Sequence, residues 1–229
     1  MPVFSKRYFS PCADGQLRCR PGSFVADDSG IVVGVWQMSE SSAELYERYP
    51  ALEQYRPMVE TKYRSERRRV EFLCVRQLLA ELLGHPVVVN YAASGQPLLD
   101  GWQVSITHTY GYAAVVLSRS LRVGIDAERT SERVEKVARR FVRPDEEAVG
   151  SEALTVLWTI KETVYKLFSE QQLGFSDIRA AMPSGEQLSA MWRAASPQPI
   201  AVENLRTGQP LFVWSELVGD CVLTFSSLS

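Results

Sequence analysis

Two long helix patterns, one in each half of the chain, constrain its fold more than any other feature. Residues 65–83 place apolar side chains at helical spacing, and Gly84 suits the position just past a helix end. Residues 154–171 carry a second strong helix pattern. Strand-like runs separated by turns follow each helix, as is typical of antiparallel hairpins. We therefore predict an α+β fold.

The other expected elements are strands and helices in a similar arrangement in each half of the chain. In the first half we predict a strand at 31–38, a serine-capped helix at 39–49, partly helical residues at 50–64 interrupted by Pro57, and strands at 85–93, 102–110 and 112–118. In the second half we predict strands at 121–128, 210–217 and 221–227, a serine-capped helix at 131–142 and a short helix start at 144–149, with 183–208 the least regular part. Two α+β subdomains of similar design follow, divided near residues 118–121.

Composition sets the class of protein. The 229 residues make one large or two small domains, and the 25 basic and 27 acidic residues give a net charge of −2, unlike a strongly basic nucleic-acid binder. The four cysteines show no metal-binding spacing, so we expect reduced thiols at Cys12, Cys19, Cys74 and Cys221. The first residues, MPVFSKRYFS, lack the apolar stretch of a signal peptide, so we expect none, and no apolar run approaches the ~20 residues of a membrane span. We expect a cytoplasmic protein with neither nucleic acid nor membrane as partner.

The strand LRVGIDAE (121–128) ends in two acids. Alternate side chains of a strand share a face, so Asp126 and Glu128 project together while Ile125 and Ala127 face the other way. Two carboxylates ~6–7 Å apart along a strand repel each other unless a cation joins them. The pattern indicates either a solvated strand end or a metal site.

The second long helix carries a matching row of residues. Trp158, Glu162 and Lys166 are spaced i, i+4, i+8 and lie in line on a largely apolar helix. A Glu–Lys pair at the rim of the core would explain Glu162 with Lys166, but not why Lys161 and Trp158 accompany them.

These patterns together resemble the 4′-phosphopantetheinyl transferase family. Its paired signature is roughly G-[IV]-D-x-E, then W-[ST]-x-K-E-x-x-x-K, and here GIDAE begins at Gly124 and WTIKETVYK at Trp158, 34 residues later. Further similar segments are SITHT (105–109), SGQPLL (94–99) and RRRVEFLCVRQLL (67–79), so that the resemblance spans about residues 60–170. The length suits the large two-lobed branch, the surfactin-synthetase-activating type, which is monomeric with internal pseudo-twofold symmetry.

The resemblance implies transfer of the phosphopantetheine arm of coenzyme A to a serine of an apo acyl or peptidyl carrier protein, as a holo-[acyl-carrier-protein] synthase does. It implies a Mg²⁺ site formed by Asp126, Glu128 and Glu162, with Glu162 as the base, acting directly or through a water. Because Ala127 adds no acid between the other two, Glu162 must be the third carboxylate. Lys166, assisted by Lys161, would stabilise charge on the phosphates.

The resemblance also implies coenzyme A contacts in the first half. His108 and Thr107 would hold the 3′-phosphate, with Lys62 and Arg68 as additional cations, which makes 1–119 the coenzyme A 3′-phosphate side and 120–229 the metal and catalytic side. Gln96 replaces a frequent lysine, so only a hydrogen bond is expected there, next to Pro97. The wider basic cluster at 62–69 is either a solvated helix start or a site for coenzyme A phosphates or an acidic carrier surface. Arg76 is expected to be structural, paired with an acid.

Two other functions fit parts of the pattern. A different metal-dependent phosphoester enzyme, such as a nuclease, also uses acids on a strand with a lysine. A non-catalytic module that binds coenzyme A or a carrier protein is the other alternative. The presence of Asp126, Glu128, Glu162 and Lys166 together favours catalysis.

Overall fold

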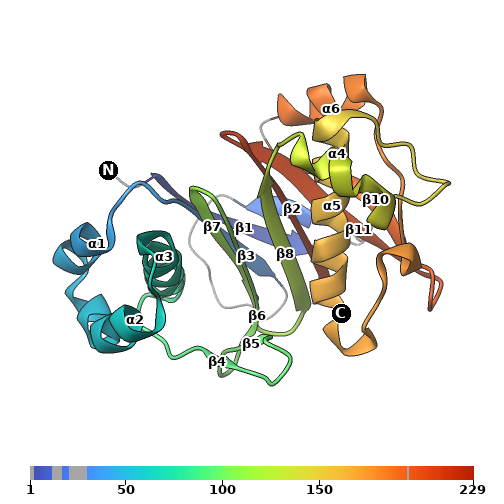
Figure 1. Cartoon of the computed structure of the whole chain (residues 1–229). Coiled ribbons are helices and arrows are strands. Elements are labelled where there is room, and N and C mark those ends of the chain that lie inside the picture. The colour runs from blue at the N-terminus through green and yellow to red at the C-terminus, as the bar shows by residue number, and fades with distance from the viewer. Residues whose placement is uncertain (1–2, 12–16, 21–29, 195) are drawn as a thin grey trace.

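The computed structural model describes residues 3–11, 17–20, 30–194 and 196–229, and it confirms the α+β fold. Two five-stranded antiparallel sheets lie against each other, with helices on their outer sides (Figure 1). Each five-stranded sheet is built from one half of the chain, the first from strands before residue 119 and the second from strands after residue 121. The division into two subdomains with pseudo-twofold symmetry stays a prediction.

The first sheet has the order β2-β1-β3-β7-β6. Its strands are β1 (Val3–Pro11), β2 (Leu17–Arg20), β3 (Ile31–Gln37), β6 (Gln103–Thr109) and β7 (Tyr112–Ser118). The helices of this half are α1 (Ser42–Arg48), η1 (Pro50–Tyr55), α2 (Arg56–Lys62) and α3 (Glu66–Leu83). A small ribbon of β4 (Asn90–Tyr91) and β5 (Pro97–Leu98) precedes β6.

The second sheet has the order β8-β12-β11-β10-β9. Its strands are β8 (Arg122–Arg129), β9 (Ile178–Ala180), β10 (Gln198–Asn204), β11 (Gln209–Val218) and β12 (Cys221–Leu228). The helices of this half are α4 (Arg133–Val137), η2 (Ala138–Arg140), α5 (Gly150–Leu167), η3 (Ser169–Gln171), η4 (Phe175–Asp177) and α6 (Gly185–Trp192).

The layers are held together by three apolar clusters. In β3, Val32 and Trp36 pack toward α3, whereas Ile31 and Val33 face the second sheet, as the alternation of a strand requires. The second sheet contributes residues such as Phe225 to the layer between the sheets. A third cluster joins α5 to the outer face of the second sheet. Burial on both faces explains the nearly continuous apolar sequences of β3 and β7.

Both long helices form where the sequence predicts them. Ser65 caps α3 by accepting a hydrogen bond from the backbone of Arg68 at 3.4 Å, and Gly84 ends it with a left-handed φ of 80°. The Ser41–Glu44 capping box begins α1. Pro57 lies in the first turn of α2 and starts that helix rather than interrupting it.

Several expected elements are wrong. Of the strand expected at 85–93 only β4 forms, and residues 144–149 form no helix. The segment expected to be irregular, 183–208, contains α6 and β10. The helix expected at 131–142 is reduced to the short α4 and η2, and its first position is preceded by Glu132 rather than by a serine cap. The strands β1 and β2 were not expected from the sequence.

Candidate functional site

The site forms where the edge strands of the two sheets run side by side. Three side chains on one face of β6 bond to β8 in succession. Thr107 donates to the carboxylate of Asp126 at 3.0 Å, and Thr109 donates to Glu128 at 2.9 Å. The Ser105 hydroxyl accepts the backbone N–H of Ile125 at 3.2 Å. The spacing of two residues along each strand therefore aligns both acids with a partner in the other half of the chain.

The two acids of β8 point away from the core between the sheets, as the sequence predicts. Ile125 and Ala127 pack into that core, so Asp126 and Glu128 face the other way. Lys166 of α5 reaches the same face, where its Nζ lies 2.7 Å from Asp126 Oδ1 and 3.0 Å from the carbonyl oxygen of Ile125. Among the described residues, Lys166 has no ion pair with Glu162. The simple Glu–Lys pair along the helix is therefore not what holds Lys166.

Glu162 lies one turn before Lys166 and is half-buried. Burial raises the pKa of its carboxyl group, and the charges of Asp126 and Glu128 raise it further, while Lys166 acts in the opposite direction. The pKa of Glu128 is also raised, first by burial, against the hydrogen bond from Thr109. The three acids are thus close enough to repel one another through a poorly solvated region.

The donor set fits a hard divalent cation in chemistry. One oxygen of Asp126, Oδ2, is buried and has no hydrogen-bond partner, which is a costly arrangement for a carboxylate. Carboxylate oxygens are the ligands that Mg²⁺ prefers, and a cation would relieve the repulsion. In the described part of the chain, however, no three His, Cys, Asp or Glu side chains are already grouped to hold a metal. The metal ligand set stays a prediction.

An open pocket of about 500 Å³ lies beside the acids, a size that suits a small molecule. Asp126, Glu128 and Lys166 form one part of its lining. Other residues of the lining come from the first half of the chain: Tyr63, Arg68, Glu71, Phe72, Val75, Arg76, Tyr91, Gly95, Pro97, Ile106, Thr107 and His108. The pocket therefore has contributions from both sides of residue 120.

Glu71 organises the cations of this wall, and sequence reasoning missed it. Its side chain is only 2% exposed and accepts from Arg67 at 2.7 Å and from Arg68 at 2.9 Å. The Nδ1 atom of His108 lies 3.7 Å from the same carboxylate. Burial lowers the pKa of His108, and Arg68 lowers it further, whereas Glu71 acts to raise it. The i+3 and i+4 spacing of Glu71 from the two arginines was the signal in the sequence.

Arg76 is a second missed pocket residue. It has no ion pair with an acid in the described residues, so the acidic partner expected from the sequence is wrong. Its guanidinium stacks 4.2 Å from the ring centroid of Phe72 and donates to the hydroxyl of Tyr91 at 3.3 Å. It is 6% exposed and still lines the pocket, which places a fixed positive charge against two aromatic rings.

The structure brings most of the predicted residues together but not all. Lys161 lies elsewhere, fully buried, where its Nζ donates to Glu146 at 2.7 Å and to two backbone carbonyl oxygens. Gln96 lines a neighbouring pocket and accepts a hydrogen bond from Ser169. Lys62 is exposed at the rim, 5.4 Å from the ring of the pocket residue Tyr63. Glu162 lines a small separate pocket of about 200 Å³.

Two of the four cysteines are described. Cys74 and Cys221 are free and buried, and burial raises the pKa of Cys221 to about 12. Cys12 lies outside the described residues, as does the side chain of Cys19. Within the described ranges, no helix is both long and apolar enough to cross a membrane.

The fold and pocket define an α+β protein whose site brings cationic side chains and carboxylates together in one lining. Residues 122–211 match the family model of the 4′-phosphopantetheinyl transferase superfamily, and this match supports membership of the chain in that superfamily. The matched range includes Asp126, Glu128, Glu162 and Lys166. The match supports phosphopantetheinyl transfer in general as the activity. No curated protein sequence gives a significant match.

Proposed function

We propose that this protein transfers the 4′-phosphopantetheine arm of coenzyme A to a serine of an apo acyl or peptidyl carrier protein. The reaction depends on Mg²⁺ and releases 3′,5′-ADP. The observation that supports this most directly is the ion pair between Lys166 and Asp126 at 2.7 Å, next to a buried oxygen of Asp126 without a partner. We further propose that the protein acts as a monomer of the two-lobed branch in the cytoplasm.

The chemistry breaks a phosphoanhydride bond and forms a phosphoester bond. The serine oxygen forms a bond to the β-phosphorus of coenzyme A, and the bond from that phosphorus to the bridging oxygen of 3′,5′-ADP breaks. The hydroxyl proton passes to a base, and the pyrophosphate charge needs nearby cations. When bound, Mg²⁺ would neutralise charge on the pyrophosphate.

The residues of the second half supply the catalytic groups in this proposal. Glu162 accepts the serine proton, since its raised pKa makes it a stronger base than an ordinary carboxylate. Lys166 donates to phosphate oxygens from the position where it now contacts Asp126. Asp126, Glu128 and Glu162 would hold the metal ion. Lys161 is not included because it is fully buried in its contacts with Glu146 and two backbone carbonyl oxygens, and Gln96 is not included because it lines a neighbouring pocket.

The residues of the first half hold the nucleotide end of coenzyme A in this proposal. Arg68 and His108 contact the 3′-phosphate, with Thr107 and Pro97 beside them in the pocket lining. Lys62 attracts the anion from the rim. Arg76, with its two aromatic neighbours, offers a surface on which a purine ring can stack.

The test is incubation with coenzyme A, Mg²⁺ and a panel of apo carrier proteins, followed by mass spectrometry. Transfer adds the mass of the arm, ~340 Da, to the carrier serine, a covalent modification absent before the reaction. Chelation of the metal should stop the gain. Cleavage of nucleic acid or simple phosphoesters without this gain would favour the other metal-dependent enzyme. Coenzyme A binding without any gain would favour the non-catalytic module.

Matched variants test the assignment of residues. Glu162→Gln and Asp126→Ala should each lower the transfer rate at least ~100-fold, while circular dichroism shows an intact fold. Glu152→Gln makes the same chemical change as the first variant at an exposed position in the first turn of α5 and should leave the rate unchanged. Transfer near the original rate in either site variant would overturn the catalytic assignment.

A further inference from the structure

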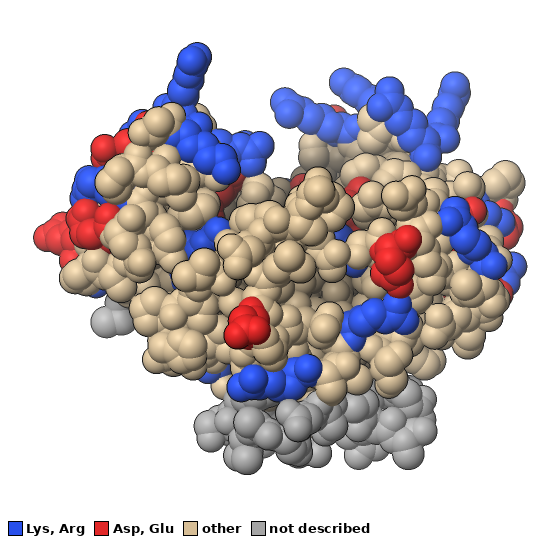
Figure 2. Space-filling model, turned by 90° about the horizontal axis from the view of Figure 1, so that it is seen from below, with Lys and Arg blue, Asp and Glu red and all other residues tan. Residues whose placement is uncertain are grey.

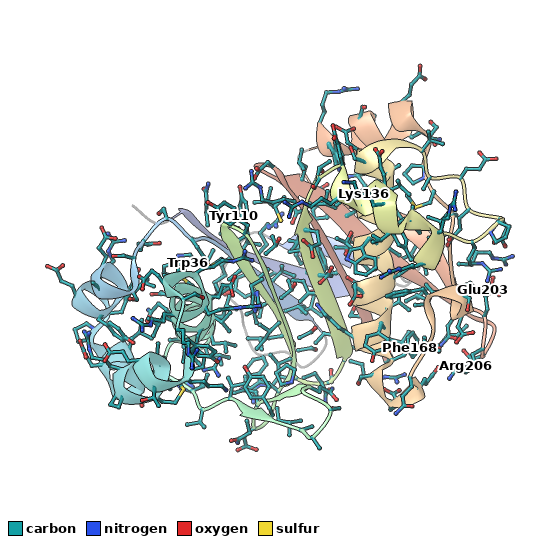
Figure 3. The ribbon with its side chains drawn as sticks, in the orientation of Figure 1. Trp36, Tyr110, Lys136, Phe168, Glu203 and Arg206 are labelled. Atoms are coloured by element: carbon teal, nitrogen blue, oxygen red, sulfur yellow. The ribbon has the colours of Figure 1, made fainter. Side chains whose placement is uncertain are left out.

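The two sheets meet through side-chain hydroxyl groups. β6 and β8 are the edge strands of their sheets, and Figure 2 shows the molecule hollowed between the side of α1–α3 and the side of α4 and α5. Ser105, Thr107 and Thr109 alternate along β6, and we name them the hydroxyl row. All three residues are buried and bond to β8. In Figure 3, Tyr110, which directly follows β6, marks the end of the strand at which Thr109 lies.

The donors to Asp126 all use one of its two carboxylate oxygens. The Thr107 hydroxyl donates to Oδ1 at 3.0 Å, and Lys166 Nζ donates to the same oxygen at 2.7 Å. The other oxygen, Oδ2, is buried and has no hydrogen-bond partner. If the donors served only to satisfy a buried acid, leaving Oδ2 without one would be costly. The arrangement is explained if Oδ2 is kept free for a cation.

Glu128 is held in the same way by the next hydroxyl of the row. Thr109 donates to its Oε2 atom at 2.9 Å, and a threonine hydroxyl has a single hydrogen to donate. Among the described residues, no hydrogen bond reaches the Oε1 atom of Glu128. Each acid of β8 therefore has one oxygen bound to a threonine of β6 and one oxygen without a donor.

Thr109 is placed to act on Glu128 and not on a ligand. It is 8% exposed, and the lining of the larger pocket includes Thr107 and His108 but not Thr109. Thr109 belongs to the first half of the chain and Glu128 to the second, so their hydrogen bond makes the orientation of this acid depend on both halves. Hydrogen-bonded partners behind a metal-binding carboxylate fix its orientation, and their loss typically lowers metal affinity about 10- to 100-fold.

We propose that Thr109, together with Thr107, is a positioning residue of the metal site: each threonine holds one oxygen of an acid of β8 and leaves the other oxygen for a divalent cation. This inference rests on the proposed function, which assigns Mg²⁺ to these acids. Neither hydroxyl group touches the cation. Binding through a single oxygen of each acid leaves ligand positions for phosphate oxygens and water, as Mg²⁺ sites typically do.

The experiment measures metal binding directly, without transfer. Mn²⁺, which shares the preference of Mg²⁺ for carboxylate oxygens, is titrated into the full chain with one equivalent of coenzyme A and no carrier protein, and the free ion is followed by electron paramagnetic resonance. Thr109→Val removes the hydroxyl group and should raise the dissociation constant of Mn²⁺ at least ~10-fold. Thr109→Ser keeps a hydroxyl group and should bind Mn²⁺ as the unmodified protein does.

Thr155→Val is the matched control. Thr155 is 2% exposed, and its hydroxyl donates to the backbone oxygen of Ser151 at 2.7 Å, so this variant loses a buried hydroxyl that does not bond to an acid. Its affinity for Mn²⁺ should stay unchanged. Circular dichroism checks the fold of every variant, and Thr109→Ala takes the place of Thr109→Val if the valine variant does not fold.

Transfer kinetics give a second measurement that a purely structural role would not produce. Thr109→Val should raise the Mg²⁺ concentration needed for half-maximal transfer by the same factor as the dissociation constant of Mn²⁺. At saturating Mg²⁺ its kcat should be restored, and its KM for coenzyme A should equal that of the unmodified protein, because Thr109 contacts neither substrate.

The outcomes separate this inference from the proposed function. If the unmodified protein transfers to no carrier, but Mn²⁺ binding is weakened in Thr109→Val alone, the proposed function is overturned and the positioning role is supported. An equal dissociation constant of Mn²⁺ in Thr109→Val and the unmodified protein overturns the inference alone, even if transfer is slower. An equal loss in Thr155→Val or Thr109→Ser also overturns it, since the loss then does not depend on this hydroxyl. If the unmodified protein binds no Mn²⁺, the inference and the proposed metal site are both overturned.

Discussion

At the scale of single residues, Glu71 connects three side chains on the first-half wall of the pocket. A carboxylate that is 2% exposed holds Arg67 and Arg68, and it faces His108 at 3.7 Å. The side chains of the two arginines are more than half exposed, so the contact with Glu71 orients them but does not bury them. Glu71 therefore orients the cations that the pocket presents to a ligand.

We predict that Glu71→Gln weakens coenzyme A binding without changing the chemistry. The neutral amide cannot hold both guanidinium groups, so the KM for coenzyme A should rise about tenfold, or about 1.4 kcal/mol, with kcat nearly constant. Glu66→Gln is the matched control on the same helix, since Glu66 accepts hydrogen bonds from Ser42 at the surface and does not line the pocket. Steady-state kinetics check this, and an equal effect of both variants would contradict it.

The lowered pKa of His108 gives a second prediction at this scale. Burial lowers the pKa of this imidazole below its ordinary value of 6.5, so the neutral form is favoured. A phosphate beside it raises its pKa again, so coenzyme A binding near neutral pH should take up a proton, and affinity should increase as the pH falls toward 6.5. Calorimetry without metal, in buffers of different ionisation enthalpy, measures this uptake. His108→Gln should reduce it, and equal uptake in that variant would contradict the prediction.

The same shift has a consequence for stability. The lowered pKa means that the folded state binds the proton less readily than the unfolded state does. The free energy of unfolding therefore has its full value, as far as His108 is concerned, above pH 6.5. It decreases as the pH falls below 6.5, because protonation then favours the unfolded state.

At the scale of elements, local patterns predict the long helices and central strands well. The caps and apolar stripe of α3 are local, and so is the alternation in β6, β7 and β8. The failures have tertiary causes. The apolar run at 85–93 covers the side of the first core, where Val89 is buried, and only Asn90 and Tyr91 pair as a strand. The irregular-looking region 183–208 becomes ordered because β10 pairs with β11 and β9.

Gly124 shows why the signature on β8 begins with glycine. A side chain at this position would collide with the backbone oxygen of Thr163 on α5, so only glycine allows the helix to approach the strand. This approach also brings Lys166 to Asp126. We predict that Gly124→Ala costs about 1–3 kcal/mol of stability, as overpacking does, and lowers the transfer rate. Gly185→Ala meets nothing within 4 Å and is the control. Thermal denaturation compares the two, and equal melting temperatures would contradict the prediction.

The Lys161–Glu146 pair joins α5 to the segment before it. Both side chains are fully buried, and Glu146 also accepts from the backbone of Ala180 at 2.9 Å. Loss of one partner leaves a buried charge, so Lys161→Met should cost about 3–5 kcal/mol. The double change Lys161→Met/Glu146→Gln should cost less than the sum of the two single changes. Denaturant unfolding measures this, and additive costs would contradict the pairing.

At the scale of the whole molecule, the site lies where two halves of the chain meet. Sequence patterns predict the acids of β8 and the row on α5, because each is local to one element. They do not predict that Thr107 and Thr109 bond to those acids, since the contact between β6 and β8 joins two separate sheets. A local pattern could not predict that Lys161 is fully buried either, because its hydrogen-bond partners come from other segments of the chain.

A ligand that fills the pocket should therefore stabilise both halves together. We predict that coenzyme A at 100 times its dissociation constant adds about 2.7 kcal/mol to global stability, from preferential binding to the folded state. Hydrogen exchange should slow both in α3 and in the β8–β12 pair, since the pocket draws its lining from residues before and after position 120. Dephospho-coenzyme A, which lacks the 3′-phosphate, is the matched ligand and should protect α3 less than coenzyme A does. Protection confined to the first half would mean that the ligand does not reach Asp126 and Lys166, and it would exclude the pocket as the place of transfer.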